Sequence, residues 1–270
     1  MTILADSHTH SRFSLDSFAS LNAMAEEAIS KGLKYLTITD HCEFDYPMIP
    51  DPDAFVLKKA PYFQAVKEVQ SKYKNKLEIL LGLEMGLVDS QAEMIEAFIK
   101  DEPFDFVIGS SHIVHGRDPY RAGYFDGVSE EEAYASYFKT IAENVSAIKC
   151  YNVYGHLDYV VRYGPNKDKN YHPSDYQDIF DEALKTIIAD GKGIEINTGG
   201  WSRGIQQPHP HPDLLKRYRE LGGQIVTFGS DAHKPKYIAD RFSLAAEILK
   251  NAGFRYYAVY KAQKPLFFAL

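Results

Sequence analysis

The segment Lys34-Tyr-Leu-Thr-Ile-Thr-Asp-His41 contains the pattern that decides the fold of this chain. Its aliphatic and β-branched residues predict a short buried strand over 34–39, and an acidic residue and a histidine follow at once. A helix predicted to begin at Leu21 precedes the strand and stops at Gly32. Residues 21–41 therefore indicate one unit of a parallel βα fold, with polar side chains at the end of the strand.

The same unit recurs along the whole chain. Seven short aliphatic runs alternate with longer segments of helical period, which favours a parallel sheet in an α/β barrel. The predicted strands cover 2–6, 34–39, 77–83, 105–109, 152–155, 193–197 and 224–229. A further run, 256–260, predicts an added or edge strand.

Several helices have recognisable ends. Ser129 with Glu132 and Ser174 with Gln177 fit the capping box, in which each side chain satisfies a free backbone N–H of the other residue. Four glycines occupy positions where helices should stop: Gly32, Gly191, Gly222 and Gly253. Apolar residues after Tyr176 form one face that we expect to pack on the sheet: Ile179, Phe180, Ala183, Leu184, Ile187 and Ile188.

Composition narrows the class of protein. The chain has 270 residues, of which 45% are hydrophobic and 25% charged, and this is typical of a globular protein with a large core. We expect one domain over 1–270, because α/β barrels often exceed 200 residues. The formal net charge of -7 argues against binding nucleic acid through a basic face, although a small anionic substrate can still bind locally.

The sequence predicts a cytoplasmic protein without a membrane partner. It begins without a basic, apolar signal-peptide pattern, and no run of apolar residues is long enough to span a membrane. Cys42 and Cys150 are too few for a disulfide framework and lack the spacing of a thiolate zinc site, so we expect ordinary thiols. The oligomeric state is left open.

Six of the ten histidines follow predicted strands, where a βα barrel forms its active-site face. They are His8, His10, His41, His112, His156 and His233. Three acidic residues accompany them: Asp16, Glu84 and Asp231. A mixture of imidazole and carboxylate suits zinc, manganese or iron better than calcium, which prefers oxygen ligands alone.

Local spacing supports this metal centre. Residues two apart in an extended segment point to the same side, so His8 with His10, and Asp231 with His233, each present two ligands together. An isolated His-x-His pair is frequent by chance, and a single histidine at a strand end is usually a hydrogen-bonded surface residue. The coincidence of six histidines at successive strand ends with Glu84 and Asp231 favours metal binding.

Together these motifs resemble those of the PHP family, which is named for its polymerase and histidinol phosphatase members. The resemblance spans residues 2–235 and includes two intervening segments as well as the four motifs of the family. The segments are Asp6-Ser-His-Thr-His10, Thr39-Asp-His41, Gly82-Leu-Glu84, Gly109-Ser-Ser-His112, Tyr154-Gly-His-Leu-Asp158 and Gly229-Ser-Asp-Ala-His233.

The resemblance implies a distorted seven-stranded (β/α)7 barrel, similar to a TIM barrel, with two or three divalent ions at the C-terminal ends of the strands. Zn²⁺ is the first expectation, with Mn²⁺ or Fe²⁺ as alternatives. The implied ligand sets are His8, His10, Glu84 and Asp231 for one ion, Glu84, His112 and His156 for a second, and Asp16, His41 and His233 for the third. For Asp16, a cap or turn before the helix at Leu21 is the alternative.

Within the family, the chain length and two segments resemble the histidinol-phosphate phosphatases. These segments are 155–159 and Glu195-Ile-Asn-Thr-Gly-Gly-Trp-Ser-Arg203. The resemblance implies hydrolysis of L-histidinol phosphate to L-histidinol and phosphate in histidine biosynthesis. Another phosphoesterase of the family, acting on nucleotides or nucleic acid ends, is the first alternative, and a non-catalytic metal-binding accessory domain is the second.

We expect two arginines to bind the phosphate monoester, because guanidinium groups bind oxyanions in a bidentate manner. Arg162 and Arg203 lie in predicted active-face segments, and Arg117 is a weaker third candidate; each has a surface or ion-pair alternative. Four further side chains lie in candidate pocket segments: Glu43, Glu195, Asn197 and Trp201. Asn197 has the alternative of fixing the turn after its strand, and Trp201 that of packing beneath its loop.

For the reaction, we expect metal ions to generate hydroxide near neutral pH and to hold phosphate oxygens during in-line attack. Glu84 and Asp231 would act through this metal-activated hydroxide. The general acid is unassigned, since Asp158 could equally orient His156. His209 and His211 lie in a proline-rich segment, which favours turn and helix-start roles over ligation.

Overall fold

Eight parallel strands form the centre of the molecule. The computed structural model describes residues 3–47 and 49–270. The main sheet has the order β1-β2-β4-β5-β6-β7-β8, and β3 pairs with β4 beyond the end of β2. The strands are β1 Ala5–Thr9, β2 Tyr35–Ile38, β3 His41–Cys42, β4 Glu78–Gly86, β5 Phe106–Ser110, β6 Val153–Tyr154, β7 Gly193–Asn197 and β8 Val226–Gly229.

The sheet curls into a nearly closed barrel, because the segment after β8 returns to β1. Thr9 and Ala232 form a parallel bridge, the Asp231 N–H donates to the His8 carbonyl at 2.9 Å, and the His10 N–H donates to Ala232 at 3.0 Å. The seven-stranded barrel predicted from the sequence is confirmed. This closure brings together the histidine-bearing motifs at 6–10 and 229–233, which lie farthest apart in the sequence.

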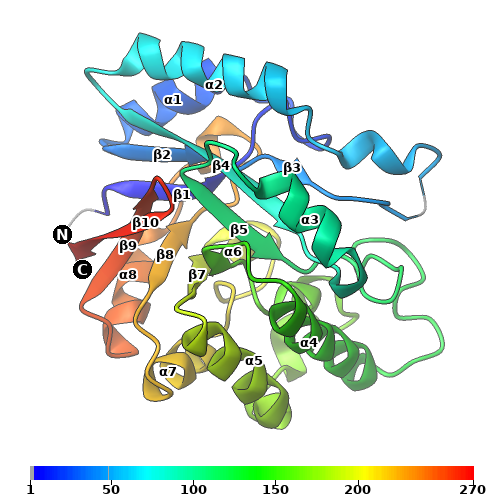
Figure 1. Cartoon of the computed structure of the whole chain (residues 1–270). Coiled ribbons are helices and arrows are strands. Elements are labelled where there is room, and N and C mark those ends of the chain that lie inside the picture. The colour runs from blue at the N-terminus through cyan, green and yellow to red at the C-terminus, as the bar shows by residue number, and fades with distance from the viewer. Residues whose placement is uncertain (1–2, 48) are drawn as a thin grey trace.

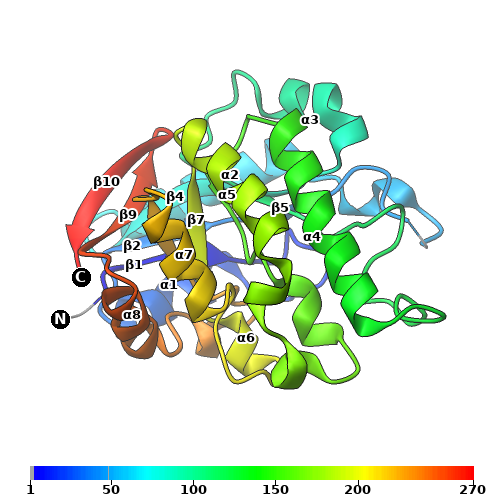
Figure 2. The same ribbon diagram turned by 90° about the horizontal axis from the view of Figure 1, so that it is seen from below.

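Helices surround the sheet, as Figures 1 and 2 show from two directions. They are α1 Leu21–Ser30, α2 Lys59–Tyr73, α3 Ala92–Ile99, α4 Glu130–Ala147, α5 Gln177–Ala189, α6 Gly199–Ser202, α7 Pro212–Glu220 and α8 Phe242–Asn251. The predicted apolar face of α5 buries Phe180, Ala183, Leu184 and Ile187. Such one-sided burial is what holds a helix against a sheet.

The predicted helix ends are confirmed in most cases. Ser129 caps α4 with the complete capping box, in which Glu132 donates its N–H to the Ser129 hydroxyl and accepts the Ser129 N–H. The glycines predicted to stop helices all have a positive φ, between 67° and 101°. The Ser174 box is wrong: Ser174 lies inside a 3₁₀ turn, Pro173–Tyr176, and α5 begins directly after it without a side-chain cap.

Two strands differ from the sequence prediction. The first strand begins at Ala5 and continues to Thr9, so His8 lies within it; Thr2 is outside the described residues. The predicted run at 256–260 is β9 Tyr256–Lys261, which forms an antiparallel hairpin with β10 Lys264–Ala269. The sequence interpretation missed β10, because its two-residue turn at Ala262 and Gln263 has positive φ without glycine.

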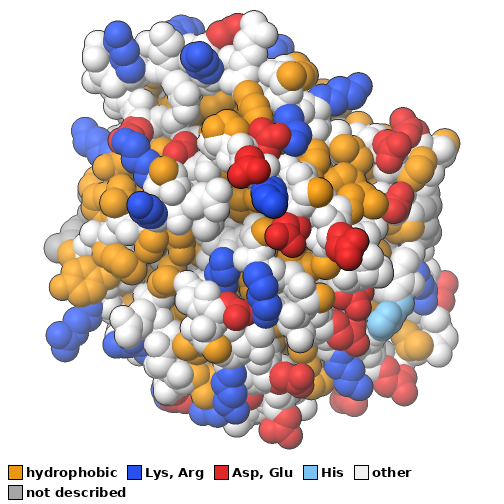
Figure 3. All heavy atoms as spheres, viewed as in Figure 1, with side chains coloured by type: hydrophobic (Ala, Val, Ile, Leu, Met, Phe, Trp, Pro, Cys, Tyr) orange, Lys and Arg blue, Asp and Glu red, His pale blue; other side chains and the backbone are white. Residues whose placement is uncertain are grey.

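The surface in Figure 3 has positive and negative side chains interspersed. Hydrophobic side chains gather over the hairpin, where Tyr256, Leu266 and Phe267 are exposed. Among the described residues, no helix is long and apolar enough to cross a membrane. Cys42 is buried and Cys150 half-buried, both as free thiols.

Candidate metal centre

The first two histidines are held on one strand end. Side chains alternate along β1, and His10 directly follows its last residue, Thr9, so His8 and His10 point to the same side of the barrel; both are fully buried. Their Nε2 atoms lie 3.0 Å apart. Two ring nitrogens at this distance require a proton or a cation between them, because two lone pairs repel.

Glu84 is the centre of the cluster. It lies within β4, which continues to Gly86, so the strand ends later than the predicted position 83 and includes this residue. Its side chain is fully buried, and Ser110 donates its hydroxyl to Oε1 at 2.8 Å. Five imidazoles have a ring nitrogen 2.8 to 3.4 Å from its oxygens: His8, His10, His41, His112 and His156.

Asp231 approaches the same cluster from the loop after β8. Its Oδ1 lies 3.5 Å from His10 Nε2 and 3.4 Å from His233 Nδ1. Its backbone has φ 54°, in the left-handed region that few non-glycine residues adopt. The hydrogen bond from the Asp231 N–H to His8 holds this conformation, which brings the carboxylate to the histidines.

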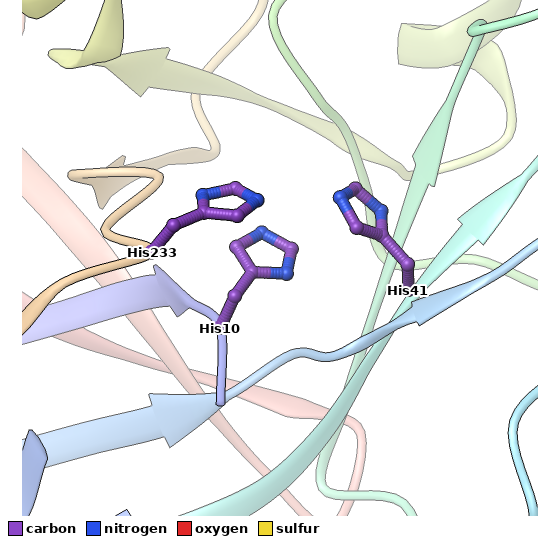
Figure 4. A group of neighbouring side chains, drawn as sticks. All are labelled: His10, His41 and His233. Carbon is purple, nitrogen blue, oxygen red and sulfur yellow. The ribbon is translucent and has the colours of Figure 1, made fainter. Parts of the chain in front are cut away.

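A second group consists of His10, His41 and His233, drawn in Figure 4. The three rings come from the residue after β1, from β3 and from the loop after β8, and their ligand atoms lie within 4.8 Å of one another. The ring of His10 stacks on His41 at 4.3 Å and on His233 at 4.1 Å between centroids. Asp16 reaches the group, with Oδ2 3.0 Å from His233 Nε2 and 3.8 Å from His41 Nε2.

The donor set fits divalent metal ions. Several buried ligand atoms make no well-directed hydrogen bond although ionisable groups lie beside them: Glu84 Oε2, His41 Nδ1 and His233 Nε2. Buried polar atoms in proteins are nearly always hydrogen-bonded, so unpaired atoms that face one another indicate a missing partner. Nitrogen and carboxylate oxygen are the donors of zinc sites.

The electrostatics indicate the charge of that partner. Burial raises the pKa of the Glu84 carboxyl, but His8, His41 and His112 outweigh burial and hold this pKa well below its usual range. Burial lowers the pKa of His8, yet Glu195 and Glu84 raise it well above its ordinary value. The carboxylates thus require positive charge among the rings, which protons or metal ions can supply.

Two of the imidazoles are kept neutral. Burial lowers the pKa of His156 to about 4, against an opposing effect of Glu84. Burial, His233 and His41 lower the pKa of His10 well below its usual value. Neutral imidazole has the free lone pair that coordinates metals, so these rings need no deprotonation before they bind an ion.

Further carboxylates orient the rings from outside. Glu195 Oε1 accepts from His8 Nδ1 at 2.7 Å, and its Oε2 accepts the His156 N–H at 3.1 Å. Glu43 Oε1 lies 2.5 Å from His112 Nδ1 and forms a further candidate ligand group with His41 and His112. Such partners fix the orientation of ligating histidines. The sequence pointed to both acids only as pocket residues, since neither is part of a His-rich motif.

A cavity of ≈ 590 Å³ opens beside the cluster. Its inner part is lined by predicted metal ligands: Asp16, His41, His112, His156, Asp231 and His233. Arg162 and Arg203 also line it, as predicted from the sequence. Arg162 is buried, its guanidinium lies 4.1 Å from the centroid of the Tyr159 ring, and its Nη1 donates to Asp231 Oδ2 at 3.3 Å.

The other predicted substrate contacts have different positions. Asn197 is fully buried; its amide nitrogen donates to Glu195 and its oxygen accepts the Gly199 N–H at 2.8 Å, so it fixes the turn after β7. Trp201 packs against the core. Neither is among the residues that line the cavity, and both positions agree with the alternatives stated from the sequence, a turn contact for Asn197 and packing for Trp201. Arg117 donates to the Gly123 carbonyl instead.

Asp158 does not contact His156, the partner that the sequence suggested. Its Oδ1 lies 2.5 Å from His209 Nδ1, and its Oδ2 accepts the His211 N–H at 2.8 Å. His211 caps α7 by accepting the Asp213 N–H, which confirms its helix-start role. The fully buried Asp158 and His209 therefore tie the loop before α7 to the segment that carries Arg162.

Comparisons with a family model and with known sequences indicate the same protein family. The sequence model of the PHP domain matches residues 6–199. A histidinol-phosphatase from Lactococcus lactis subsp. lactis is 34% identical over 96% of this chain and 95% of its own length. A probable histidinol-phosphatase from Clostridium acetobutylicum is 32% identical over 97% of this chain and 96% of its own length.

A similar solved structure has the same named activity as these two relatives. The crystal structure of histidinol phosphate phosphatase from Lactococcus lactis, complexed with zinc, L-histidinol and phosphate, superposes with a TM-score of 0.89 at 34% identity. The match covers 97% of this chain and 98% of that protein. A putative histidinol phosphatase from Listeria monocytogenes, at 19% identity and a TM-score of 0.77, shares the fold.

Proposed function

The chain belongs to the PHP domain family, and we propose that it is a metal-dependent histidinol-phosphatase, which hydrolyses L-histidinol phosphate to L-histidinol and phosphate. The observation that carries this proposal is the match, over 97% of the chain, to a structure that holds zinc, L-histidinol and phosphate. The cluster around Glu84 supports it independently, because it contains the donors that such ions need.

Nine side chains would hold two or three divalent ions. They are His8, His10, Asp16, His41, Glu84, His112, His156, Asp231 and His233. Zn²⁺ is the proposed ion, with Mn²⁺ or Fe²⁺ as alternatives, since these metals accept imidazole together with carboxylate. Bound ions would supply positive charge to the phosphate oxygens and lower the pKa of water, so that hydroxide is available near neutral pH.

The residues of the chain itself divide the remaining work. Arg162 and Arg203 would bind the phosphate oxygens, and the fixed position of Arg162 over Tyr159 reduces the entropy lost on binding. Glu84 and Asp231 would contribute to catalysis by positioning the ions, without a separate proton transfer. The general acid for the leaving alkoxide stays unassigned.

The proposal also covers the size of the substrate, the cellular location and the domain organisation. A small phosphate monoester fits a cavity of ≈ 590 Å³, and the net charge of -7 disfavours long nucleic acid substrates. A cytoplasmic location and a single domain over 1–270 are part of this proposal and are supported by the sequence pattern and the continuous barrel. The oligomeric state is not assigned.

The test is phosphate release from L-histidinol phosphate and, in parallel, from a nucleoside monophosphate. Protein treated with a chelator is reloaded separately with zinc, manganese or iron. We expect a metal-restored preference for L-histidinol phosphate that falls in Arg203→Ala. Equal or faster nucleotide hydrolysis would preserve the metal-dependent reaction but reject the substrate, and bound metal without any turnover would favour an accessory domain.

A further inference from the structure

Asp118 is a buried carboxylate on the cavity wall, away from every predicted metal ligand in sequence. It lies in the loop between β5 and α4 and lines the cavity, although only 4% of its surface is exposed. Its Oδ1 accepts the Tyr120 N–H at 2.8 Å, and its Oδ2 accepts the hydroxyl of Tyr46. Two separate segments therefore fix the direction of this carboxylate.

One cation lies near it without forming an ion pair: Tyr46, Asp118 and Tyr120 together raise the pKa of the Arg121 guanidinium. Among residues 3–47 and 49–270, no lysine or arginine forms an ion pair with Asp118. Arg121, on the same wall, lies instead over the Tyr46 and Tyr120 rings, 5.7 and 5.6 Å from their centroids. Two carboxylate oxygens can accept about four hydrogen bonds in all, so acceptor capacity remains. A charge this buried is costly unless a partner supplies it with donors.

The surroundings suit a small cationic group. Tyr46 and Phe55 both line the cavity, with ring centroids 4.3 Å apart, and Tyr120 lies 5.7 Å from Tyr163. Burial and Asp118 raise the pKa of Tyr46, so its hydroxyl keeps the proton that it donates. Arg121 lies over Tyr46 and Tyr120 and Arg162 over Tyr163, whereas among the described residues no lysine or arginine lies over the Phe55 ring. An aromatic face beside a carboxylate attracts a positive, nitrogen-bearing head group.

We propose that Asp118 determines substrate specificity by binding the protonated, nitrogen-bearing end of the phosphate monoester. This inference rests on the proposed function, because L-histidinol phosphate carries an amino group and an imidazole beside its phosphate. The metal ligands and Arg162 would receive the phosphate, while Asp118 accepts N–H groups from the opposite end of the same molecule. A neutral alkyl phosphate would gain nothing from this contact.

The test compares kcat/KM for L-histidinol phosphate with kcat/KM for n-propyl phosphate, in the metal-loaded protein. Asp118→Asn keeps the shape of the side chain and removes its charge. We expect the ratio of the two values to fall about 10- to 100-fold, mainly through KM for L-histidinol phosphate, as for loss of a charged hydrogen bond. Asp126→Asn, an exposed acid in the same loop, should leave the ratio unchanged.

The outcomes separate this inference from the proposed function. If the wild-type protein does not hydrolyse L-histidinol phosphate, the proposed function fails. If it does, and Asp118→Asn lowers both activities in proportion or neither, the inference about Asp118 is wrong. Should Asp118→Asn not fold, Tyr46→Phe decides, because it loosens the carboxylate but keeps its charge. A smaller fall in the same ratio supports the inference, and an unchanged ratio overturns it.

Discussion

At the scale of single residues, Glu84 is the side chain that contacts most of the metal centre, because its two oxygens lie beside five histidine rings. We predict that Glu84→Gln lowers bound metal and reduces phosphatase activity at least about 100-fold, since loss even of an outer partner commonly costs 10- to 100-fold. Metal analysis and phosphate release measure both effects. Glu78→Gln, at the start of the same strand, is the control, because Glu78 pairs with Lys261 at the surface. Full metal content in Glu84→Gln would contradict this role.

Removing either arginine should affect activity, but only removal of Arg162 should also lower stability. Arg162 is buried and paired with Asp231, whereas Arg203 is exposed at the cavity. We predict that Arg162→Ala reduces both activity and the free energy of unfolding, by about 1–3 kcal/mol, because it leaves a buried carboxylate without this donor. Arg203→Ala should raise KM with little change in stability. Urea unfolding and steady-state kinetics distinguish them, and equal stability of the two variants would oppose this assignment.

The sequence predicted individual residues well where a motif surrounds them. The six histidines predicted at strand ends come together with Glu84 and Asp231, as expected. Glu43 was predicted as a pocket residue, but its contact with His112 was not. That contact, the position of Asp118 and the pair of Asp158 with His209 depend on loops far apart in the chain. For Asn197 the structure agrees with the alternative stated from the sequence, because its amide contacts Glu195 and Gly199 and fixes the turn after β7.

At the scale of elements, the strand ends position the ligands, and glycines make room behind them. A Cβ added to Gly229, the last residue of β8, would overlap the Glu195 carboxylate and lie 2.5 Å from His8 Cβ. We predict that Gly229→Ala displaces this Glu195–His8 pair and lowers metal affinity about 10- to 100-fold.

A matched substitution isolates this effect. Gly109 occupies the end of β5, and an added Cβ would meet the apolar side chains of Leu87 and Tyr151. Gly109→Ala should therefore reduce stability through overpacking and leave metal affinity near the wild-type value. Metal titration of both variants is the measurement. A loss of affinity shared by both would show that general distortion, and not the Glu195 contact, controls the site.

The elements were predictable where hydrophobic period and caps agreed. Seven strands and the capped start of α4 follow from local signals. The first strand was placed too early because its motif residues are polar, yet all are buried within the barrel. The strand β9 was predicted, but β10 and its hairpin with β9 escaped prediction, since the turn between them lacks the glycine that usually identifies such loops.

At the scale of the whole molecule, the metal centre lies where the barrel closes. Its ligands come from β1, β3, β4 and the segments after β5, β6 and β8, so bound ions would link the first and last strands of the sheet. We predict that a chelator lowers the melting temperature and that added zinc restores it. A ligand at 100 times its Kd stabilises the folded state by about 2.7 kcal/mol. A melting temperature independent of metal would contradict this link.

We propose that hydrolysis of L-histidinol phosphate depends on ions bound at this metal centre. The most direct measurement is phosphate release from this substrate while metal-free protein is titrated with zinc, with bound metal determined at each point. We predict no release without metal and an activity that rises until two or three ions are bound per chain. Full activity in excess chelator, or saturation with zinc without phosphate release, would contradict metal-dependent hydrolysis of this substrate.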